Sequence, residues 1–401
     1  MKSSKYRVVS IVIHLGVVLA LASAAGCQSN KQKTPQQQAE QRWAASRAAV
    51  LGSLAKDQLE SGQFDKCRET LDKAKRLDPT NAQLCILYAK MAIEQGQLDV
   101  ADRECAEARR LDPKNAEADY MSGVVYQRWL KPQVAHDYYT SAAEKDAREV
   151  AYPLAQAEML IDLGRPEEAL GLLQSRLEDF GTSAVIYDTI GQLYVGRGEY
   201  AHAVDALRQA STLASEDMLI REHLAMAMFF NKQYREAQEG FVRVLKEPRN
   251  AERAELYIAL GECQINLGHA REGRDSFDKA TQVAPQSAPA WLCLTKAALE
   301  LGDVRRAELT MRRAMALAPE MAETQLMLGF VRLKQDKLPE AMAAFRKASS
   351  MDPQDPVSLC MIGYVLGKGG KPEQAAQYYG RALKLKPDDE LAAKLLASVN
   401  E

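Results

Sequence analysis

Small residues recur at a fixed interval through most of the chain. Two columns of them, twelve residues apart, each hold Ala or Gly at nine of ten positions, and members of a column are 34 residues apart except at one interval of 36. The first column is Ala55, Ala89, Gly123, Ala157, Gly191, Ala225, Gly261, Thr295, Gly329 and Gly363, and the second is Cys67, Ala101, Ala135, Ala169, Ala203, Ala237, Gly273, Ala307, Ala341 and Ala375. Antiparallel helices need small residues where their backbones approach most closely, so the columns predict repeated helix pairs.

Helix-ending signals share this period. A third column of small residues lies seven positions after the second, at Ala74, Ala108, Ala142, Ala210, Ala280, Ala314, Ala348 and Ala382, and is interrupted by Arg176 and Val244. Proline follows five residues later at Pro79, Pro113, Pro285, Pro319, Pro353 and Pro387. Glycines at Gly62, Gly96, Gly164, Gly198, Gly268, Gly302 and Gly370 fall between the two helices of a pair. Each period is therefore predicted to be helix, glycine turn, helix and proline stop.

These columns resemble the 34-residue pattern of the tetratricopeptide repeat (TPR). The resemblance covers about Ala48 to Pro387 and implies an all-α fold, a right-handed superhelix (α-solenoid) of about ten helix-turn-helix repeats over residues 43–387. Ala147, Gly181 and Ser215 replace the expected proline, and two residues are inserted between the sixth and seventh repeats, which predicts irregular geometry in the middle. Residues 388–401, with leucines at helical spacing, are predicted to form a capping helix.

In the TPR family, the first helix of each repeat lines a concave groove that binds peptides or helices of partner proteins. The resemblance places apolar residues at groove positions, and the candidate protein-binding residues are Met226, Ile258, Leu292, Leu326, Phe330 and Tyr364. The alternative is that neighbouring repeats cover many of them as core. Lys56, Lys90 and Lys296 also fall at a groove position, but they lack the neighbours of a carboxylate clamp and are predicted to be solvated.

The N-terminal 26 residues resemble a bacterial lipoprotein signal peptide. Lys2, Lys5 and Arg7 precede an apolar run, and Ala24, Ala25 and Gly26 stand directly before Cys27. The resemblance implies cleavage before Cys27 and attachment of several acyl chains, palmitate-like in length, to that residue. Several chains together form a stable membrane anchor, whereas one binds only marginally.

Two alternatives remain for this segment. Residues 8–25 could stay as a signal anchor, since their length is near the minimum that spans a bilayer, or the chain could be cut near Ala25 as an ordinary secreted protein. All three readings export the chain. The glutamine-rich residues 27–42 are predicted to form a disordered tether. Gln28, in a position where Asp retains lipoproteins in the inner membrane, favours the outer membrane of a host with two membranes, facing the periplasm.

Composition removes several classes of function. Lys and Arg number 52 against 54 Asp and Glu, so the overall charge of −2 offers no general attraction for nucleic acid. The seven cysteines form no CxxC pair, which argues against a metal site. Cys67, Cys85, Cys105, Cys263, Cys293 and Cys360 are predicted to be buried free thiols, with a disulfide among the first three as an alternative. His136, His202, His223 and His269 are predicted to be isolated and exposed. With no catalytic motif, we expect neither an enzyme, nor a cofactor, nor a small-molecule substrate.

Together these features predict a lipid-anchored scaffold of the bacterial cell envelope that binds another envelope protein and assists assembly, secretion or localisation of a complex. One alternative is a non-catalytic regulatory or targeting subunit of an envelope enzyme complex, such as a glycosyltransferase or cell-wall hydrolase. Another is a structural protein whose repeat ends stack head to tail. The charged final helix argues against stacking.

Overall fold

The computed structural model describes residues 34–400. The predicted signal peptide and Cys27 lie outside these residues. Within them, all regular secondary structure is helical, with 22 α-helices and one short 3-10 helix, which confirms the predicted all-α class. The chain divides into two compact units, with the boundary between Tyr152 and Pro153, and each unit is described separately below.

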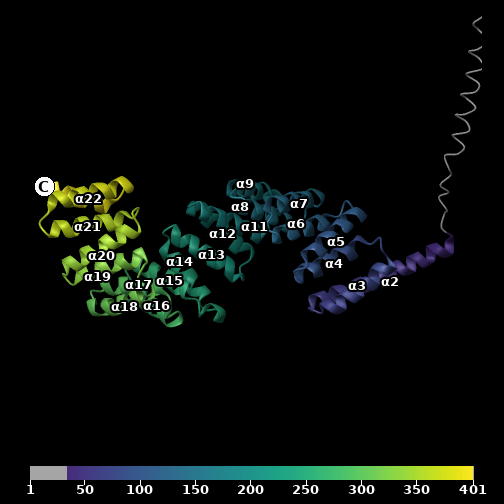
Figure 1. The fold of residues 1–401 in the computed structure, drawn as a ribbon, viewed down its shortest axis with the longest axis horizontal. Helices are drawn as coiled ribbons and strands as arrows, with labels where there is room; N and C mark the ends of the chain where they lie inside the picture. The colour runs from purple at the N-terminus through teal and green to yellow at the C-terminus, as the bar shows by residue number, and fades with distance from the viewer. Residues whose placement is uncertain (1–33, 401) are drawn as a thin grey trace, which may run out of the picture. The chain divides into compact units, whose positions relative to one another are not determined.

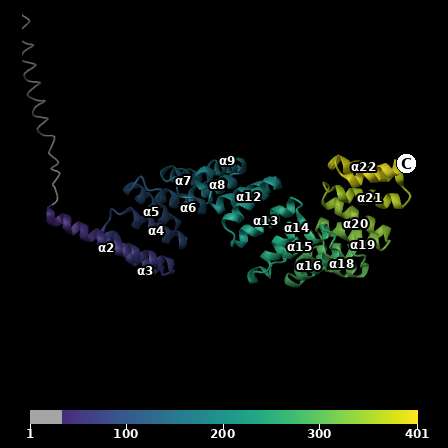
Figure 2. The ribbon, with the colours of Figure 1, turned by 180° about the vertical axis from the view of Figure 1, so that it is seen from behind.

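The first unit contains three complete helix pairs (Figure 1, purple to blue; Figure 2 shows the same helices from behind). The pairs are α2 (Pro35–Glu60) with α3 (Phe64–Leu77), α4 (Ala82–Glu94) with α5 (Leu98–Leu111), and α6 (Ala116–Arg128) with α7 (Pro132–Lys145). We call the first helix of a pair its A helix and the second its B helix. Helices α3 and α5 each pack on their own A helix and on the A helix of the next pair, and α7 packs on α6. Helix α8 (Ala151–Asp162) begins at the end of this unit.

The second unit continues the same alternation. After α8 come α9 (Pro166–Ser175), α10 (Leu177–Phe180), α11 (Ala184–Gly196), α12 (Tyr200–Leu213), α13 (Met218–Phe230), α14 (Tyr234–Val244), η1 (Pro248–Asn250), α15 (Ala254–Asn266), α16 (Ala270–Val283), α17 (Ala288–Glu300), α18 (Val304–Leu317), α19 (Ala322–Lys334), α20 (Leu338–Met351), α21 (Pro356–Lys368), α22 (Pro372–Leu385) and α23 (Glu390–Asn400). Substantial contacts run between neighbouring or next-neighbouring helices, as expected for a linear array.

The turn inside each pair has one residue with left-handed backbone. All seven glycines predicted for this turn have φ between 69° and 82°, a conformation that a side chain disfavours. Three repeats hold another residue at the same position, namely Leu130, Lys232 and Asp336, with φ of 56°, 60° and 58°. The repeat therefore imposes the left-handed conformation at this position whichever residue is present, and glycine adopts it with the least strain.

The two columns of small residues lie where the paired helices touch. Every member of both columns is buried. Where the A helix has glycine, a bulky side chain of the B helix fills the space: a Cβ atom built on Gly329 would lie 2.3 Å from the ring of Phe345, and one on Gly261 would lie 2.4 Å from Phe277. The glycines thus make room for the largest core side chains.

The middle of the array is irregular, as the interrupted columns predict. Helix α9 ends at Ser175, and after Arg176 only the short α10 follows. Helix α14 stops at Val244, the second interruption, and the inserted residues form η1. The side-chain amide of the buried Asn250 donates a 3.0 Å hydrogen bond to the Val244 carbonyl, so the insertion itself closes the end of α14.

The predicted disordered tether is wrong for residues 35–42, which form the first turns of α2. Thr34 and Gln37 make a capping box: the Gln37 amide donates to the Thr34 hydroxyl, and the Thr34 amide donates to the Gln37 side chain. Pro35 occupies the first helical turn, where its missing N–H costs nothing. Residues 27–33 of the predicted tether lie outside the described part of the chain.

Candidate functional site

The predicted groove residues all lie on A helices of the second unit. Five of them are half-buried: Met226, Ile258, Leu326, Phe330 and Tyr364. The sixth, Leu292, is 1% exposed and packs in the core with Met311 and Val331. Leu292 therefore offers no surface to a partner, and for this residue the core alternative is the correct one.

Leu326, Phe330 and Tyr364 share one neighbourhood. They pack against a buried cluster built by α20, α21 and α22, which includes Phe345, Ile362 and Tyr379. The ring of Phe330 meets that of Phe345 edge-on, with centroids 5.4 Å apart. The half-buried side chains thus have one face fixed by the core and one face left for solvent or a partner.

An apolar pocket of about 410 Å³ opens between α17 and α19. Leu299, Met327, Phe330 and Leu333 form its apolar lining, and Lys296, Glu300 and Lys334 form its charged rim. An apolar hollow with a few polar groups at its edge is the form that binding sites for apolar side chains usually take. Of the six candidate protein-binding residues that the sequence singles out, Phe330 is the one that lines this pocket.

Lys296 at the rim is paired rather than simply solvated, which corrects the sequence prediction for this residue. The Lys296 ammonium lies 3.0 Å from a carboxylate oxygen of Glu262 on α15. Burial alone would lower the Lys296 pKa, but Glu262 outweighs it and the pKa is raised. Lys90 on α4 likewise lies 2.5 Å from Glu117 on α6. These pairs connect successive A helices.

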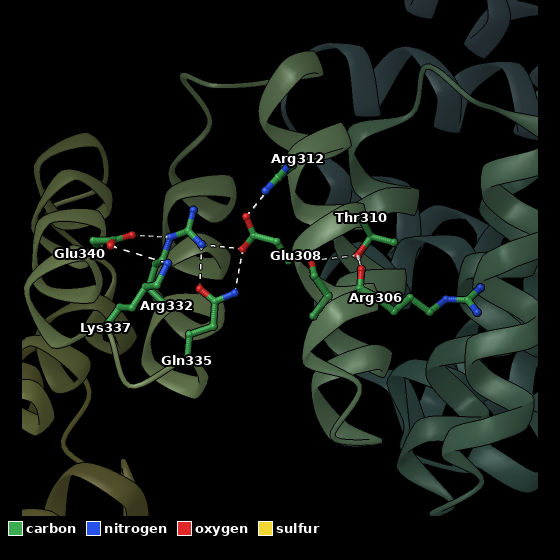
Figure 3. Close-up of polar contacts among 9 residues, drawn as sticks. Arg306, Glu308, Thr310, Arg312, Arg332, Gln335, Lys337 and Glu340 are labelled. Carbon is green, nitrogen blue, oxygen red and sulfur yellow. Dashed lines mark hydrogen bonds and ion pairs between the residues drawn. The ribbon is translucent and has the colours of Figure 1, made fainter.

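A charged cluster fixes α19, which carries Phe330, between its neighbours. Figure 3 shows Arg332 of α19 lying between Glu308 of α18 and Glu340 of α20, at 2.5 Å and 2.9 Å. Gln335 also donates to Glu308, at 2.9 Å. Burial tends to raise the Glu308 pKa, but these hydrogen bonds, with one from Arg312, outweigh it and lower the pKa. The cluster holds one wall of the pocket in place.

The first unit has a different hollow, which sequence analysis missed. It measures about 620 Å³ and has a polar lining that includes Lys90, Glu117, Tyr120, Lys145 and Tyr152. The Tyr120 and Tyr152 ring centroids are 5.2 Å apart, and burial, with the nearby Glu117, raises the pKa of Tyr152 to about 12. Lys145, which lines the hollow, pairs with the buried Asp119, and Asp119 also accepts a hydrogen bond from Ser141.

Two predictions about isolated side chains have different outcomes. All six cysteines in the described part are free thiols, so the disulfide alternative is wrong. Five of them are buried, and the prediction of buried thiols fails only for the half-buried Cys293.

His223 is not exposed and isolated: its Nδ1 lies 2.8 Å from a carboxylate oxygen of Asp188, and this contact joins α13 to α11. The hydrogen bond that the His223 ring donates to Asp188 raises the His223 pKa, against the opposing effect of burial, and the charges of Glu222 and Asp217 add to the rise.

This pair predicts a pH-dependent stability. Because the folded-state pKa of His223 is above its ordinary value of 6.5, the pair stabilises fully below about pH 6.5 and loses this contribution as pH rises through the folded-state pKa. We expect Asp188→Asn to lower the free energy of unfolding by about 1–2 kcal/mol near pH 6, and by less at higher pH. Urea unfolding across this range measures the difference. Glu272→Gln, which removes the exposed partner of His269, should have no such effect; equal profiles for both variants would contradict the assignment.

Residues 34–400 contain no group of His, Cys, Asp or Glu side chains arranged to hold a metal ion. Among the helices described, none has both the length and the apolar character needed to cross a membrane.

Stacked A and B helices of this kind define a helical-repeat protein. The family model of the cilia and flagella-associated protein 70 C-terminal domain matches residues 229–401, and two tetratricopeptide-repeat models match residues 184–217 and 154–175. The chain is thus built of tetratricopeptide repeats, as the 34-residue period predicts. No curated protein sequence matches it.

A solved structure with a TM-score above 0.5 supports this fold, and two others are similar with lower scores. A tetratricopeptide repeat protein from Parabacteroides merdae is 16% identical, with a TM-score of 0.57 over 63% of this chain and 98% of its own. The yeast Tom70 structure is 13% identical, with a TM-score of 0.47 over 88% of each chain. The Cut9-Hcn1 structure of the APC/C is also 13% identical, with a TM-score of 0.48 over 90% of this chain and 98% of that one. At these identities the likeness concerns the fold alone.

Proposed function

We propose that this protein is a membrane-tethered scaffold that binds another cell-envelope protein on the A-helix face of its second unit. In this role it assists assembly, secretion or localisation of a complex and carries out no chemistry itself. The observation that carries the proposal is the apolar pocket between α17 and α19, with Phe330 in its wall. A TPR fold is generally an interaction scaffold, and apolar surface left open on such a fold favours a protein partner.

The form of the pocket favours an apolar anchor on the partner. Four apolar side chains line it, and its charges stand at the rim, where Lys296 is already paired with Glu262. A partner helix or extended segment would place a large apolar side chain against Phe330 and Leu333, with polar groups facing Glu300 and Lys334. Binding in this form requires no charged group to be buried.

The tether rests on the sequence before the first described helix. Small residues directly before Cys27 support lipid attachment there, and Gln28 favours the outer membrane of a host with two membranes. In this arrangement the repeats would face the periplasm, and the chain would reach its partner from the membrane surface.

One experiment tests both parts. Cells expressing the full chain are crosslinked and fractionated, and proteins captured with it are identified by mass spectrometry. We expect Phe330→Glu to remain with the membranes but to lose one envelope protein that the parent captures, because a carboxylate in the pocket would be desolvated. We expect Cys27→Ser to leave the membranes and to retain that partner.

Matched variants keep the outcome clear. Leu309→Glu adds the same charge at a side chain that is 64% exposed on α18, away from the pocket, and should keep the partner. Lys334→Glu alters the rim without touching the core, so it should weaken capture even if Phe330→Glu disturbs folding. An unchanged partner set in both pocket variants would refute the binding site, and a Cys27→Ser protein that stays on membranes would refute the lipid anchor. Copurification of an enzyme activity would favour the alternative role as an enzyme's targeting subunit.

A further inference from the structure

Each A helix that follows a B helix has one stripe covered by it. Leu84 of α4, for example, is 2% exposed and packs with Leu71 and Ala74 of the preceding α3. The residues at this position in the later repeats are Ala118, Tyr152, Ile186, Ile220, Leu256, Ala290, Thr324 and Ser358, and each is at most 7% exposed. Helix α2 is the first helix of the described residues 34–400, so no B helix among them covers its stripe.

Three large apolar side chains stand along this uncovered side of α2. Trp43, Val50 and Leu54 are 63%, 70% and 46% exposed. Steps of seven and four residues keep them on one side of the helix. We call these three residues the open stripe of α2. An exposed apolar row of this kind marks a surface that meets a partner or a membrane.

Trp43 lies on a part of α2 that projects from the array. Residues 35–47 are all exposed or half-buried, and Figures 1 and 2 show these first turns extending past α4 and α5. Trp43 is the one large apolar side chain in this segment, whose other residues are mostly Gln, Ala and Arg. Packing within the array therefore does not account for the tryptophan.

The charges around Trp43 complement the phosphates of lipid head groups. Between Glu40 and Asp57, α2 carries three cations and no carboxylate. Two of the cations, Arg42 and Arg47, belong to the turns beside Trp43, and the Arg47 guanidinium lies over its ring at 5.4 Å. Tryptophan is enriched where membrane meets water, and arginine beside it can bury its stem while its charge reaches the phosphates.

The tether provides the membrane as the surface nearest to the open stripe. This step rests on the proposed lipid anchor at Cys27. Seven residues, 28–34, separate Cys27 from the start of α2, and an extended chain of that length spans about 25 Å. Trp43 lies eight residues beyond Pro35, about 12 Å along the helix. Lipid is therefore at high effective concentration beside the open stripe.

We infer that α2 lies along the surface of the membrane that holds Cys27, with Trp43, Val50 and Leu54 facing the lipid. Trp43 sits at the level of the head groups, and Arg47 contacts their phosphates. Three side chains bind too weakly to retain the chain by themselves, so the acyl chains remain the anchor. The contact of α2 fixes how the first unit stands on the membrane.

Tryptophan quenching in the full, lipid-modified chain tests this orientation. The chain has three tryptophans, so Trp129→Phe and Trp291→Phe leave Trp43 alone while keeping an aromatic ring at the other two sites. The protein is reconstituted into vesicles of phosphatidylethanolamine and phosphatidylglycerol whose acyl chains are brominated near the head group. We expect bromine to quench Trp43 about fivefold more than the tryptophan of a matched control, because the open stripe is the side of α2 that contacts lipid.

The control moves the tryptophan to another side of the same helix. Trp43→Phe with Ala49→Trp places an exposed ring about 120° around the helix axis from Trp43. Adding Val50→Glu to the chain with Trp43 alone should lower the quenching about threefold, since a carboxylate would have to enter the interface. Leu309→Glu, a similarly exposed position on α18, should leave the quenching unchanged.

Flotation of the same vesicles separates the two ways of failing. A chain that does not float with the vesicles refutes the lipid anchor and the inference with it. A chain that floats, but whose Trp43 is quenched no more than the ring of Ala49→Trp, overturns the inference alone and leaves the open stripe to a protein partner. Quenching that disappears when the protein is diluted in lipid also overturns it, because a second copy would then be needed.

Discussion

Replacing Gly329 with alanine should lower the free energy of unfolding by about 2 kcal/mol, although alanine is the better helix former by about 1 kcal/mol. The new Cβ would stand 2.3 Å from the ring of Phe345, which is fully buried and has no free space to move into. Either the ring leaves its preferred rotamer or α19 and α20 move apart. Urea unfolding followed by circular dichroism measures the loss.

A second substitution should recover much of this loss. Phe345→Leu in the Gly329→Ala background recreates the pair found at Ala157 and Leu173, both of them buried. We expect the double variant to be more stable than the sum of the single effects predicts, with a coupling of about 1–2 kcal/mol. Gly171→Ala is the control, because nothing lies within 4 Å of its new Cβ; there the protein should gain about 0.5–1 kcal/mol. A gain at Gly329 as well would refute the clash.

Phe277→Ala should lower the free energy of unfolding by more than Gly329→Ala does, by about 3–5 kcal/mol. Phe277 lies on α16, and its ring is fully buried. The ring faces Gly261 on the A helix of its own pair and packs with Leu294 and Ala297 on the A helix of the next pair. Its removal leaves a cavity at the joint between two repeats. Because stability in a repeat array depends on such joints, we expect the urea transition to broaden as well as to shift.

Phe230→Ala gives the matched comparison. This phenylalanine is 40% exposed on α13 and stacks on Tyr200, so truncation should cost about 1 kcal/mol or less without broadening the transition. If Phe277→Ala shifts the midpoint and leaves the transition sharp, the joint at α16 does not limit cooperativity, and the loss is that of an ordinary core cavity.

The repeat could be predicted from the sequence because it depends on spacing alone. A small residue, a turn glycine and a proline stop recur at the same positions in most repeats, and the structure places those that are present as expected. The sequence also indicates where the repeats are irregular: Arg176 and Val244 interrupt the third column of small residues at the points where α9 and α14 end. These features are local or follow from one period.

Exposure of the groove residues could not be predicted in the same way. Leu292 and Leu326 occupy the same position in successive repeats, yet Leu292 is buried and Leu326 is half-buried, so the period alone does not determine exposure. The charged pairs that join successive A helices can be found from their spacing in the sequence. Lys296 follows Glu262 by one period, and His223 follows Asp188 by one period and one residue. Opposite charges separated by a repeat length predict contacts that a search for local motifs misses.

The linear contact pattern described above has a consequence for how this protein can change over generations. Within each described unit, the substantial helix contacts join near neighbours along the chain. A substitution on α11 thus reaches α19 mainly through the joints between them, and each joint attenuates its effect. The hollow of the first unit and the pocket beside Phe330 in the second unit are for this reason separate targets of selection: substitutions can alter one while the other continues unchanged.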